Sequence, residues 1–416
     1  MTRSVRAATA RANLPYTMTG VEYIAPGAAV IGISKNGARF YGSTGNILKM
    51  CLDLATAATP TWTNVHDFTA EGGANHTVGG IHEMFNGEVL VPCTNGSGFS
   101  ALYVSSGWAA NPATATWTKV LTATNGVFSP QYSLSDFCSG TNGVVYLIDS
   151  NSAQTLGGEA NAATDATRGG FGMLSTDFGK TWTKVFDLVA YATSRGFPYA
   201  AGLHTHGSCY DEVDDRIYQI YGDNTGQGKD VAGLGYAQVV YSDDRGATWN
   251  RLPNPSKFDT SAPGSATTIQ YIGVAPLETC VLFSPDVNQP AAAVMYPRAG
   301  YRQLGVAHIS TTIYYGGVNG YMQRTGVGID KPVFVGGTVV QTQTGSRKVQ
   351  IPMLHPGQSA WSRLDYDIPV QSPNITGYGF GRVFGPFANG RIVATCRHSV
   401  GGSGNTLMRA TLVNPT

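Results

Sequence analysis

Charged side chains are scarce in this chain. Asp, Glu, Lys and Arg make up 13% of its 416 residues, about half the usual share, and the net charge is +1. A nucleic-acid-binding surface needs a strong positive excess, so we expect no nucleic-acid partner. No apolar run approaches the roughly 20 residues of a membrane span, so we expect no membrane insertion.

Cysteine pairs at metal-binding or redox spacing are missing as well. The six cysteines are Cys51, Cys93, Cys138, Cys209, Cys280 and Cys396, with no C-x-x-C pair among them. Several lie inside apolar, strand-like runs, where a free thiol acts as a small hydrophobic group. We therefore expect reduced, buried thiols, with some disulfide as the alternative.

The N-terminus lacks the apolar stretch of a secretory signal. Arg3, Arg6 and Arg11 are followed by no apolar core. We interpret residues 1–20 as an arm that would dock on a larger assembly. The expected location is a virion surface if the chain is phage-encoded, and otherwise the cytoplasm.

Long amphipathic helices are also absent, because no 3.6-residue periodicity extends over three turns with caps. Glycine is abundant instead, with 53 of 416 residues, which suits many tight turns. These features predict an all-β chain.

Two segments share the pattern Ser-x-Asp-x-Gly-x-Thr-Trp. Their residues are Ser175, Asp177, Gly179 and Trp182 in the first copy and Ser242, Asp244, Gly246 and Trp249 in the second. Asp bonds to nearby backbone N–H groups and Gly accepts positive φ, so each segment predicts a turn. The pattern resembles the Asp-box, the repeat of bacterial neuraminidases. That resemblance implies a sialidase-like β-propeller in which the Trp packs between sheets, so these eight residues are assigned to structure.

Tryptophan spacing predicts the number of repeats. Trp62, Trp117, Trp182, Trp249 and Trp361 are 55, 65, 67 and 112 residues apart, and the last interval equals two repeats of 56. One repeat without Trp, near Tyr301, and one after Trp361 bring the total to seven.

Turn dipeptides give an independent count. Each of these dipeptides precedes a short apolar strand. They lie at 36–37, 86–87, 142–143, 214–215, 277–278, 319–320 and 389–390. Each repeat then holds one hairpin at this turn and another at the Asp-box, which gives four antiparallel strands. We predict one β-propeller over 21–416 with seven blades, at about 21–70, 74–124, 130–190, 199–256, 266–310, 311–370 and 375–414. Six blades, or a β-sandwich, are the alternatives.

The strand order separates two faces of such a propeller. Turns between first and second strands and between third and fourth strands share one face, and the long connections 149–170 and 222–236 lie on the other. Long connections in compact folds are usually functional or mobile. The candidates for ligand binding on that face are His204, His206, Asp223, His82, Asp149 and Arg397.

His204 and His206 alternate along one strand and are expected to share one side of it, near the central channel. They are the candidates for holding a divalent metal, with His82 as a third ligand, although no cofactor is predicted. The alternative is that these polar groups bond to backbone and ordered water along the channel.

Sialidase activity is not expected. The family resemblance implies three arginines for the substrate carboxylate, a Tyr–Glu nucleophile pair and an Asp acid/base. The arginine motif near the N-terminus is missing, and Arg168, Arg195, Arg302 and Arg382 cannot be matched to the others. Another glycosidase would need two paired carboxylates, which the sequence does not identify.

Binding without chemistry is the preferred function. Low charge, many small residues and 21 tyrosines resemble the composition of bacteriophage virion proteins. We therefore expect an adhesion module of a tail or capsid surface, with a host glycan or a neighbouring virion subunit as partner. A glycoside hydrolase and a purely structural decoration protein are the alternatives.

Overall fold

The computed structural model describes most of the chain between Thr17 and Val413. The described residues are 17–24, 27–34, 37–72, 76–95, 98–122, 137–148, 171–195, 204–222, 238–252, 271–276, 280–285, 292–297, 306–308, 322–324, 333–335, 338–341, 347–354, 362–367, 379–384, 387, 390–397 and 406–413.

Five separate antiparallel sheets follow one another along the described chain, and each is one blade. The first blade is β2 (Ala29–Ile33), β3 (Phe40–Thr44), β4 (Ile47–Cys51) and β5 (Trp62–Asp67). The second is β6 (Thr77–Val78), β7 (His82–Glu83), β8 (Val89–Asn95), β9 (Gly98–Ser106) and β10 (Thr116–Thr122). The third is β11 (Phe137–Ser139), β12 (Val145–Ile148), β13 (Phe171–Ser175) and β14 (Thr183–Asp187). The fourth is β15 (His204–Asp211), β16 (Arg216–Gly222), β17 (Gln238–Ser242) and β18 (Asn250–Arg251). The fifth is β19 (Tyr271–Pro276), β20 (Cys280–Pro285), β21 (Ala292–Pro297) and β22 (Val306–His308).

The remaining strands form a single nine-stranded sheet. They are β1 (Thr17–Ile24), β23 (Met322–Arg324), β24 (Val333–Val335), β25 (Thr338–Gln341), β26 (Arg347–Leu354), β27 (Ser362–Asp367), β28 (Gly379–Phe384), β29 (Arg391–Arg397) and β30 (Thr406–Val413). The described connections contain three short helical segments, namely α1 (Thr69–Gly72), the 3-10 turn η1 (Pro112–Thr114) and α2 (Leu188–Ser194).

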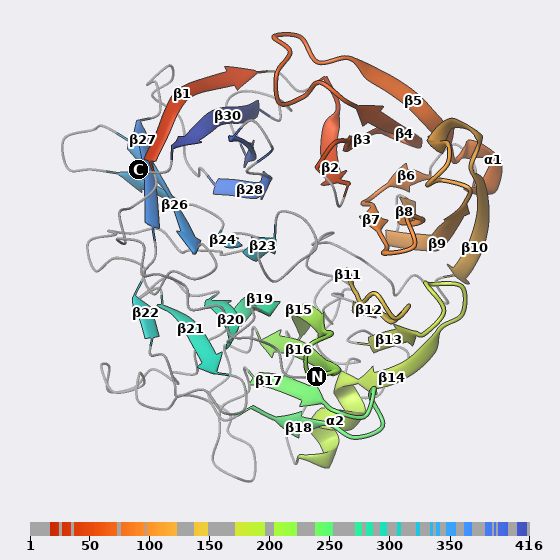
Figure 1. Cartoon of the computed structure of the whole chain (residues 1–416). Coiled ribbons are helices and arrows are strands. Elements are labelled where there is room, and N and C mark those ends of the chain that lie inside the picture. Colours follow the sequence, from red (N-terminus) through yellow and green to blue (C-terminus); the bar gives the residue numbers. More distant parts are fainter. Residues whose placement is uncertain are drawn as a thin grey trace, which may run out of the picture.

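The sheets are arranged radially around a common centre, with β2, β7, β11, β15, β19 and β28 innermost and β5, β10, β14 and β18 at the rim (Figure 1). Radial repetition of small antiparallel sheets defines a β-propeller. The predicted all-β propeller is confirmed.

The predicted number of seven blades, or six as the alternative, is wrong. Five blades are separate sheets, and the strands assigned to the last repeats are joined instead of standing apart. Strand β25 pairs with β26 and also contacts β28 through Thr338 and Gly379, which merges the two groups. Short sequence patterns specify hairpins, but they do not specify whether two neighbouring hairpins share a sheet edge.

The predicted hairpin turns are present wherever their residues are described. Gly37, Gly87, Gly143 and Gly390 have φ of 71°, 82°, 86° and 74°, and Asp215 has φ of 48°. This left-handed backbone is the one that glycine adopts without steric cost. The turns predicted at 277–278 and 319–320 lie outside the described residues.

The first strand of the chain belongs to the last sheet. Strand β1 pairs with β30, from Thr17 opposite Val413 to Ile24 opposite Leu407. The division predicted from the sequence put residues 1–20 in an arm and 21–70 in the first blade, so β1 spans that boundary. Pairing of the two chain ends closes the ring and leaves no open seam there.

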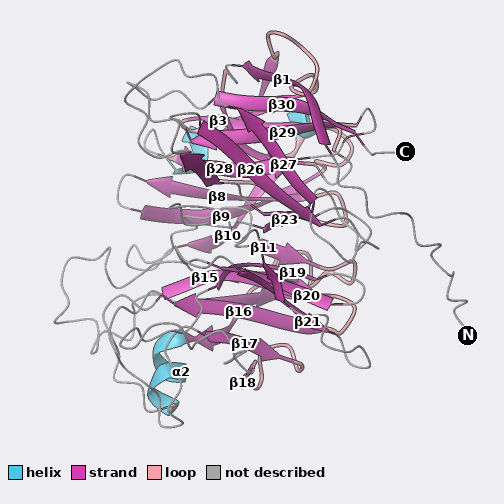
Figure 2. Cartoon of the chain, turned by 90° about the vertical axis from the view of Figure 1, so that its left-hand side faces the viewer, coloured by secondary structure: helices cyan, strands magenta, loops and turns pink. Residues whose placement is uncertain are grey.

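Strands run across the thickness of the molecule, so each turn lies on one of two faces (Figure 2). Antiparallel order puts the turns between first and second strands and between third and fourth strands on one face, called here the hairpin face. The second-to-third turns and the connections between blades, including α1 and α2, lie on the opposite face, called the connection face.

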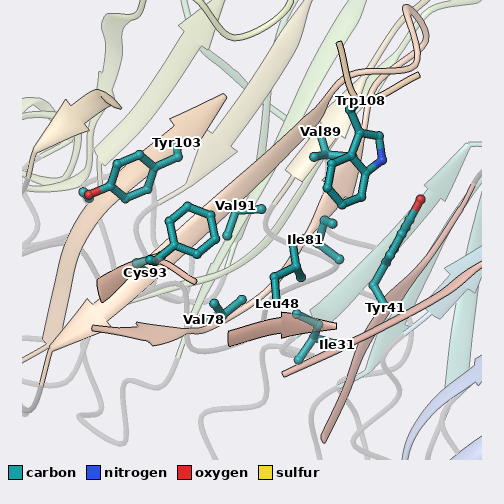
Figure 3. Packing of buried hydrophobic residues seen from close by; sticks show 12 residues of the cluster. Ile31, Tyr41, Leu48, Val78, Ile81, Val89, Val91, Cys93, Tyr103 and Trp108 are labelled. Carbon is teal, nitrogen blue, oxygen red and sulfur yellow. The ribbon is translucent and has the colours of Figure 1, made fainter. Parts of the chain in front are cut away.

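The core consists of layers between neighbouring blades. Val89 and Val91 of β8 pack against the first blade, whereas Leu90 between them packs against the third. Figure 3 shows the first of these layers, in which Tyr41 and Leu48 meet the second blade. Because both faces of each blade are buried, the central strands read as continuous apolar runs.

Candidate functional site

The first Ser-x-Asp-x-Gly-x-Thr-Trp motif forms a closed hydrogen-bonded turn between β13 and β14. Ser175 Oγ donates to Asp177 Oδ1 at 2.8 Å and accepts from the Gly179 N–H at 2.8 Å. Asp177 also accepts from the Thr181 N–H at 2.9 Å and from its hydroxyl at 2.7 Å. Trp182 Nε1 donates to the Gly179 carbonyl at 2.8 Å. These groups satisfy one another within the turn.

The second motif, between β17 and β18, repeats this arrangement. Ser242 Oγ donates to Asp244 at 2.7 Å, and Thr248 donates to Asp244 through N–H and hydroxyl at 2.8 and 2.6 Å. Trp249 differs, because its Nε1 donates to the Val185 carbonyl of the third blade at 2.9 Å. The second motif is therefore also a joint between blades.

A third turn of the same kind has no sequence match. Cys51 Sγ donates to Asp53 Oδ1 at 2.9 Å, and the Thr61 N–H donates to the same oxygen at 3.0 Å, one residue before Trp62. Cysteine replaces serine, and four extra residues separate it from Thr61. Burial, together with the bond to Asp53, raises the pKa of Cys51 to about 12. The available sequence signal was a Thr-Trp pair with an Asp several residues before it.

In the second blade a glutamate from the neighbouring turn takes the aspartate's role. Glu88, just before β8, accepts from the Ser105 hydroxyl at 2.6 Å and from the N–H groups of Gly107 and Trp108 at 3.0 and 3.1 Å. These turns all lie on the hairpin face, and their polar groups are engaged with one another. We find no ligand geometry in the described turns of that face.

The predicted ligand residues are only partly described. His204 begins β15 opposite Gly222, and Arg397 ends β29 opposite Gly379, which puts both backbones at the connection face. The side chains of His204, His206 and Arg397 lie outside the described part, as do Asp149 and Asp223 entirely. Their roles stay predictions.

A β-bulge affects the expected alternation of the two histidines. The pairing of β15 with β16 shifts between Thr205 and Gly207, which makes His206 the extra residue. A bulge interrupts the two-residue periodicity of a strand. Alternation alone therefore does not fix the sides of His204 and His206 on β15, and their shared side stays a prediction. Similar shifts occur in β2, β19 and β28, which are also innermost strands.

His82 lies at the opposite end of its blade from His204. It pairs with Leu90, next to the first hairpin turn of the second blade, and its Nε2 is 2.9 Å from Ser139 Oγ of the third blade. The structure thus places His82 near the hairpin face, apart from the start of β15. The strand is interrupted between β6 and β7, and this break was not visible as a pattern in the sequence.

A tyrosine–glutamate pair was missed by the sequence analysis. Tyr41 OH donates to Glu83 Oε2 at 2.8 Å, between the first and second blades. Tyr41 is fully buried, and burial, reinforced by the negative charge of Glu83, raises its pKa far above the usual range. The pair links the first and second blades through a buried hydrogen bond.

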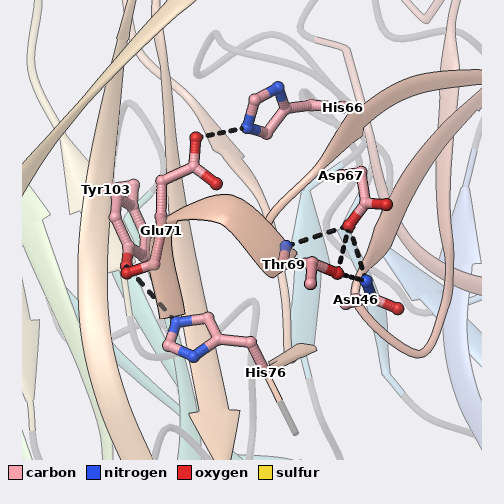
Figure 4. A network of polar contacts seen from close by, with 7 residues as sticks. All are labelled: Asn46, His66, Asp67, Thr69, Glu71, His76 and Tyr103. Carbon is pink, nitrogen blue, oxygen red and sulfur yellow. Dashed lines mark hydrogen bonds and ion pairs between the residues drawn. The ribbon is translucent and has the colours of Figure 1, made fainter. Parts of the chain in front are cut away.

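A polar network occupies the connection face between the first two blades (Figure 4). Asp67 Oδ1 accepts from the Thr69 N–H at 2.9 Å, from the Thr69 hydroxyl at 2.6 Å and from Asn46 Nδ2 at 2.5 Å. His66 Nε2 lies 2.8 Å from Glu71 Oε1. These five residues come from β5, from α1 and from the tight turn between β3 and β4. We call them the connection-face network.

Aromatic rings lie directly beneath this network. His66 lies 4.6 Å from the Phe68 ring centroid and 5.2 Å from that of Trp117, and Phe68 and Trp117 meet edge to face at 4.9 Å. The side chains of His66 and Glu71 are 24% and 25% exposed. Packed aromatic rings thus contact polar side chains that are partly exposed to solvent. No single motif marks these residues in the sequence.

Metal-binding geometry is absent from the part of the chain that the structure describes, where no three His, Cys, Asp or Glu side chains are grouped to hold an ion. Likewise, none of the described helices is long and apolar enough to cross a membrane. Among the described cysteines, Cys51, Cys93 and Cys209 are buried and form no disulfide bond.

Comparisons with known proteins find likeness only at the level of structure. No protein-family model matches the chain, and no curated protein matches its sequence. The chain is similar to the polysaccharide lyase Uly1, with 12% identity over 99% of this chain and 95% of that one and a TM-score of 0.47. It is also similar to a protein of unknown function from Dyadobacter fermentans (12% identity, 94% and 99% covered, TM-score 0.39) and to Drosophila Plexin A (10% identity, 96% and 88% covered, TM-score 0.44). Values this low carry no argument for function, which has to come from the residues.

Proposed function

We propose that this chain is a non-catalytic binding propeller of a bacteriophage virion surface that engages a glycan through its connection face. The observation that carries the proposal is the connection-face network, where amide, hydroxyl, imidazole and carboxylate groups are held in place above aromatic rings. Sugars offer many hydroxyl groups, which the polar groups of such a surface complement. The sparse charge of the whole chain is consistent with a neutral polar ligand.

Four of the described carboxyl groups have the chemistry of hydrogen-bond acceptors in turns, not of proton donors in catalysis. The pKa is lowered for Asp53, Asp67, Asp177 and Asp244, each of which accepts hydrogen bonds in a turn or connection. A glycosidase needs a carboxylic acid with a raised pKa as proton donor. None of these four has that property.

A glycan array with the purified full-length chain tests the proposal. We expect binding to one or more neutral polysaccharides, and a loss of about tenfold or more in affinity for Asn46→Ala and Asp67→Ala. Lys180→Ala, on the exposed hairpin face, is the matched control and should bind like the wild type. Binding that is unchanged in both network variants would place the site elsewhere, and no glycan binding at millimolar concentration would refute the proposal.

A neighbouring virion subunit is the other expected partner, and the same variants separate it from a glycan. Loss of incorporation into particles for Asp67→Ala, without any glycan binding by the wild type, would identify a protein partner. Release of new reducing ends from a bound polysaccharide would instead identify the alternative, a glycoside hydrolase.

A further inference from the structure

Two buried polar groups at the layer between the third and fourth blades have no hydrogen-bond partner in the described structure. They are the hydroxyl of Ser208 on β15 and the amide Nε2 of Gln219 on β16. Ser208 is 4% exposed and Gln219 is fully buried. Burying such groups without a partner costs free energy, so folded proteins rarely leave them unpaired.

The amide of Gln219 is held in one orientation by a residue of the third blade. The Tyr146 hydroxyl of β12 donates to Gln219 Oε1. This bond leaves Nε2, which carries two N–H donors, as the amide atom without an acceptor.

Strand pairing brings the two unpaired groups to the same place. Ser208 and Gln219 are directly opposite each other in the antiparallel pairing of β15 and β16. Directly opposite residues have Cβ atoms about 5 Å apart and share one face of the sheet. Because Gln219 bonds to Tyr146, that face is the one that packs on the third blade, as it is for the neighbouring pair Tyr210 and Ile217.

A glycine keeps this region free of a further side chain. A Cβ atom at Gly172 of β13 would lie 1.8 Å from the Tyr146 hydroxyl oxygen and 2.9 Å from Gln219 Oε1. The same layer also contains the buried apolar side chains of Ile148 and Leu174. Polar atoms from two blades thus meet in a largely buried layer.

We propose that this site binds one structural water molecule, which accepts a hydrogen bond from Gln219 Nε2 and donates one to Ser208 Oγ. The occupant must accept a hydrogen bond from the amide and can bond to the Ser208 hydroxyl in either direction, which water does. Neither of the two side chains carries a charge that would compensate a buried ion. Buried waters in proteins characteristically bridge such otherwise unpaired groups.

The bound water would join the innermost strand of the fourth blade to its neighbours. Strand β15 carries Ser208 two residues after His206, at the end of the bulged segment. A bridge from Ser208 through water and Gln219 to Tyr146 would hold this segment against the third blade. The inference stands apart from the proposed glycan site, which lies between the first and second blades.

The Ser208→Ala variant tests the proposal through the sign of its effect on Tm. If water bridges Ser208 and Gln219, the variant loses a hydrogen bond and its Tm falls by about 1–3 °C. If the hydroxyl has no partner, removing it relieves an unpaired buried group, and the Tm stays constant or rises. A constant or raised Tm overturns the proposal.

Three further measurements make the test independent of folding yield. Ser105 is as buried as Ser208 but donates to Glu88 and accepts from the Val89 N–H, so Ser105→Ala should lower the Tm and gives the effect of losing two known bonds. In a Tyr146→Phe/Gln219→Met background the water loses its amide partner, and Ser208→Ala should then cost less than in the wild type. A crystal structure of the wild type should show one density peak at about 3 Å from both Ser208 Oγ and Gln219 Nε2. A site without this peak would refute the proposal.

Discussion

Single aspartates and glycines shape the hairpin face of this propeller. Asp177 and Asp244 each gather hydrogen bonds from the backbone and hydroxyl of a following threonine. The sequence predicted these roles from turn chemistry. The Cys51–Asp53 turn escaped prediction, because hydrogen bonding tolerates a cysteine and a longer loop whereas a sequence pattern does not.

Asp244 should make stability depend on pH in the acid range. Hydrogen bonds from Thr248, first from its hydroxyl and then from its N–H, lower the pKa of Asp244 to about 2, against roughly 3.9 in an unfolded chain. The unfolded state therefore binds more protons between these values, and stability falls as pH drops through this window. The wild type should exceed Asp244→Asn in Tm above about pH 4.

The difference in Tm between the wild type and Asp244→Asn should shrink steadily from about pH 4 to pH 2. Thermal unfolding followed by circular dichroism over pH 2–7 measures it. A difference that stays constant over that range would show that ionised Asp244 does not stabilise the turn.

Replacing Gly246 by alanine should destabilise the protein more than the same replacement at another glycine with positive φ. It has φ of 93°, and a Cβ atom there would lie 2.4 Å from Val185 Cβ. Gly246→Ala should therefore destabilise the protein by about 2–4 kcal/mol, from backbone strain and from overpacking between blades.

Gly45→Ala is the matched control for Gly246→Ala. Gly45 has φ of 59° with nothing within 4 Å of its Cβ position, so its replacement should cost only about 1 kcal/mol. Urea unfolding of both variants gives the comparison. Equal losses would mean that contact with Val185 contributes nothing.

At the scale of elements, the pairing of β1 with β30 is reinforced by a cluster of charges. Glu22 of β1 lies 2.6 Å from Arg391 Nη2 and 3.0 Å from Nε of the buried Arg409. The two arginines also donate to carbonyl oxygens of the first blade, Arg391 to Ala55 at 2.7 Å and Arg409 to Leu54 at 3.2 Å. The cluster thus ties three separate chain segments together.

Glu22→Gln should loosen this closure. It leaves the buried Arg409 without a compensating charge, and we expect a loss of about 1–3 kcal/mol, moderated because Glu22 is partly exposed. Hydrogen exchange should become faster in β1 before it does in other strands. Asp187→Asn, which breaks the exposed pair with Lys184, is the control and should cost less than about 1 kcal/mol. Exchange in β1 that is no faster than in the control would contradict a role for Glu22 in closure.

Innermost strands are the elements in which sequence reasoning failed. His206 was placed by simple alternation, yet β15 carries a bulge at that residue. A bulge depends on how β15 pairs with β16, and no local property of the His-Thr-His segment reveals that pairing. His82 was misplaced for the same reason, since the break between β6 and β7 appears only in their pairing with β8.

For the whole molecule, burial between blades should make the described thiols unreactive. Burial raises the pKa of Cys51 to about 12 and also raises that of Cys93, so both thiols stay protonated near neutral pH. Iodoacetamide should leave Cys51, Cys93 and Cys209 unmodified in the native protein and label all three in denaturant. Peptide mass spectrometry reads this out, and rapid native labelling of Cys93 would contradict its burial.

The sequence by itself determined the hairpins of the fold and the turns that join their strands. Turn chemistry and apolar runs specify hairpins through interactions within a few residues, so the strands around Gly87, Gly143 and Gly390 were predictable. Tertiary structure alone decided which hairpins share a sheet, that β1 joins β30, and that His82 and His204 lie at opposite ends of their blades. It also assembled the connection-face network from residues of β5, α1 and a distant turn. These outcomes depend on contacts between segments far apart in the chain, and no spacing along the sequence records them.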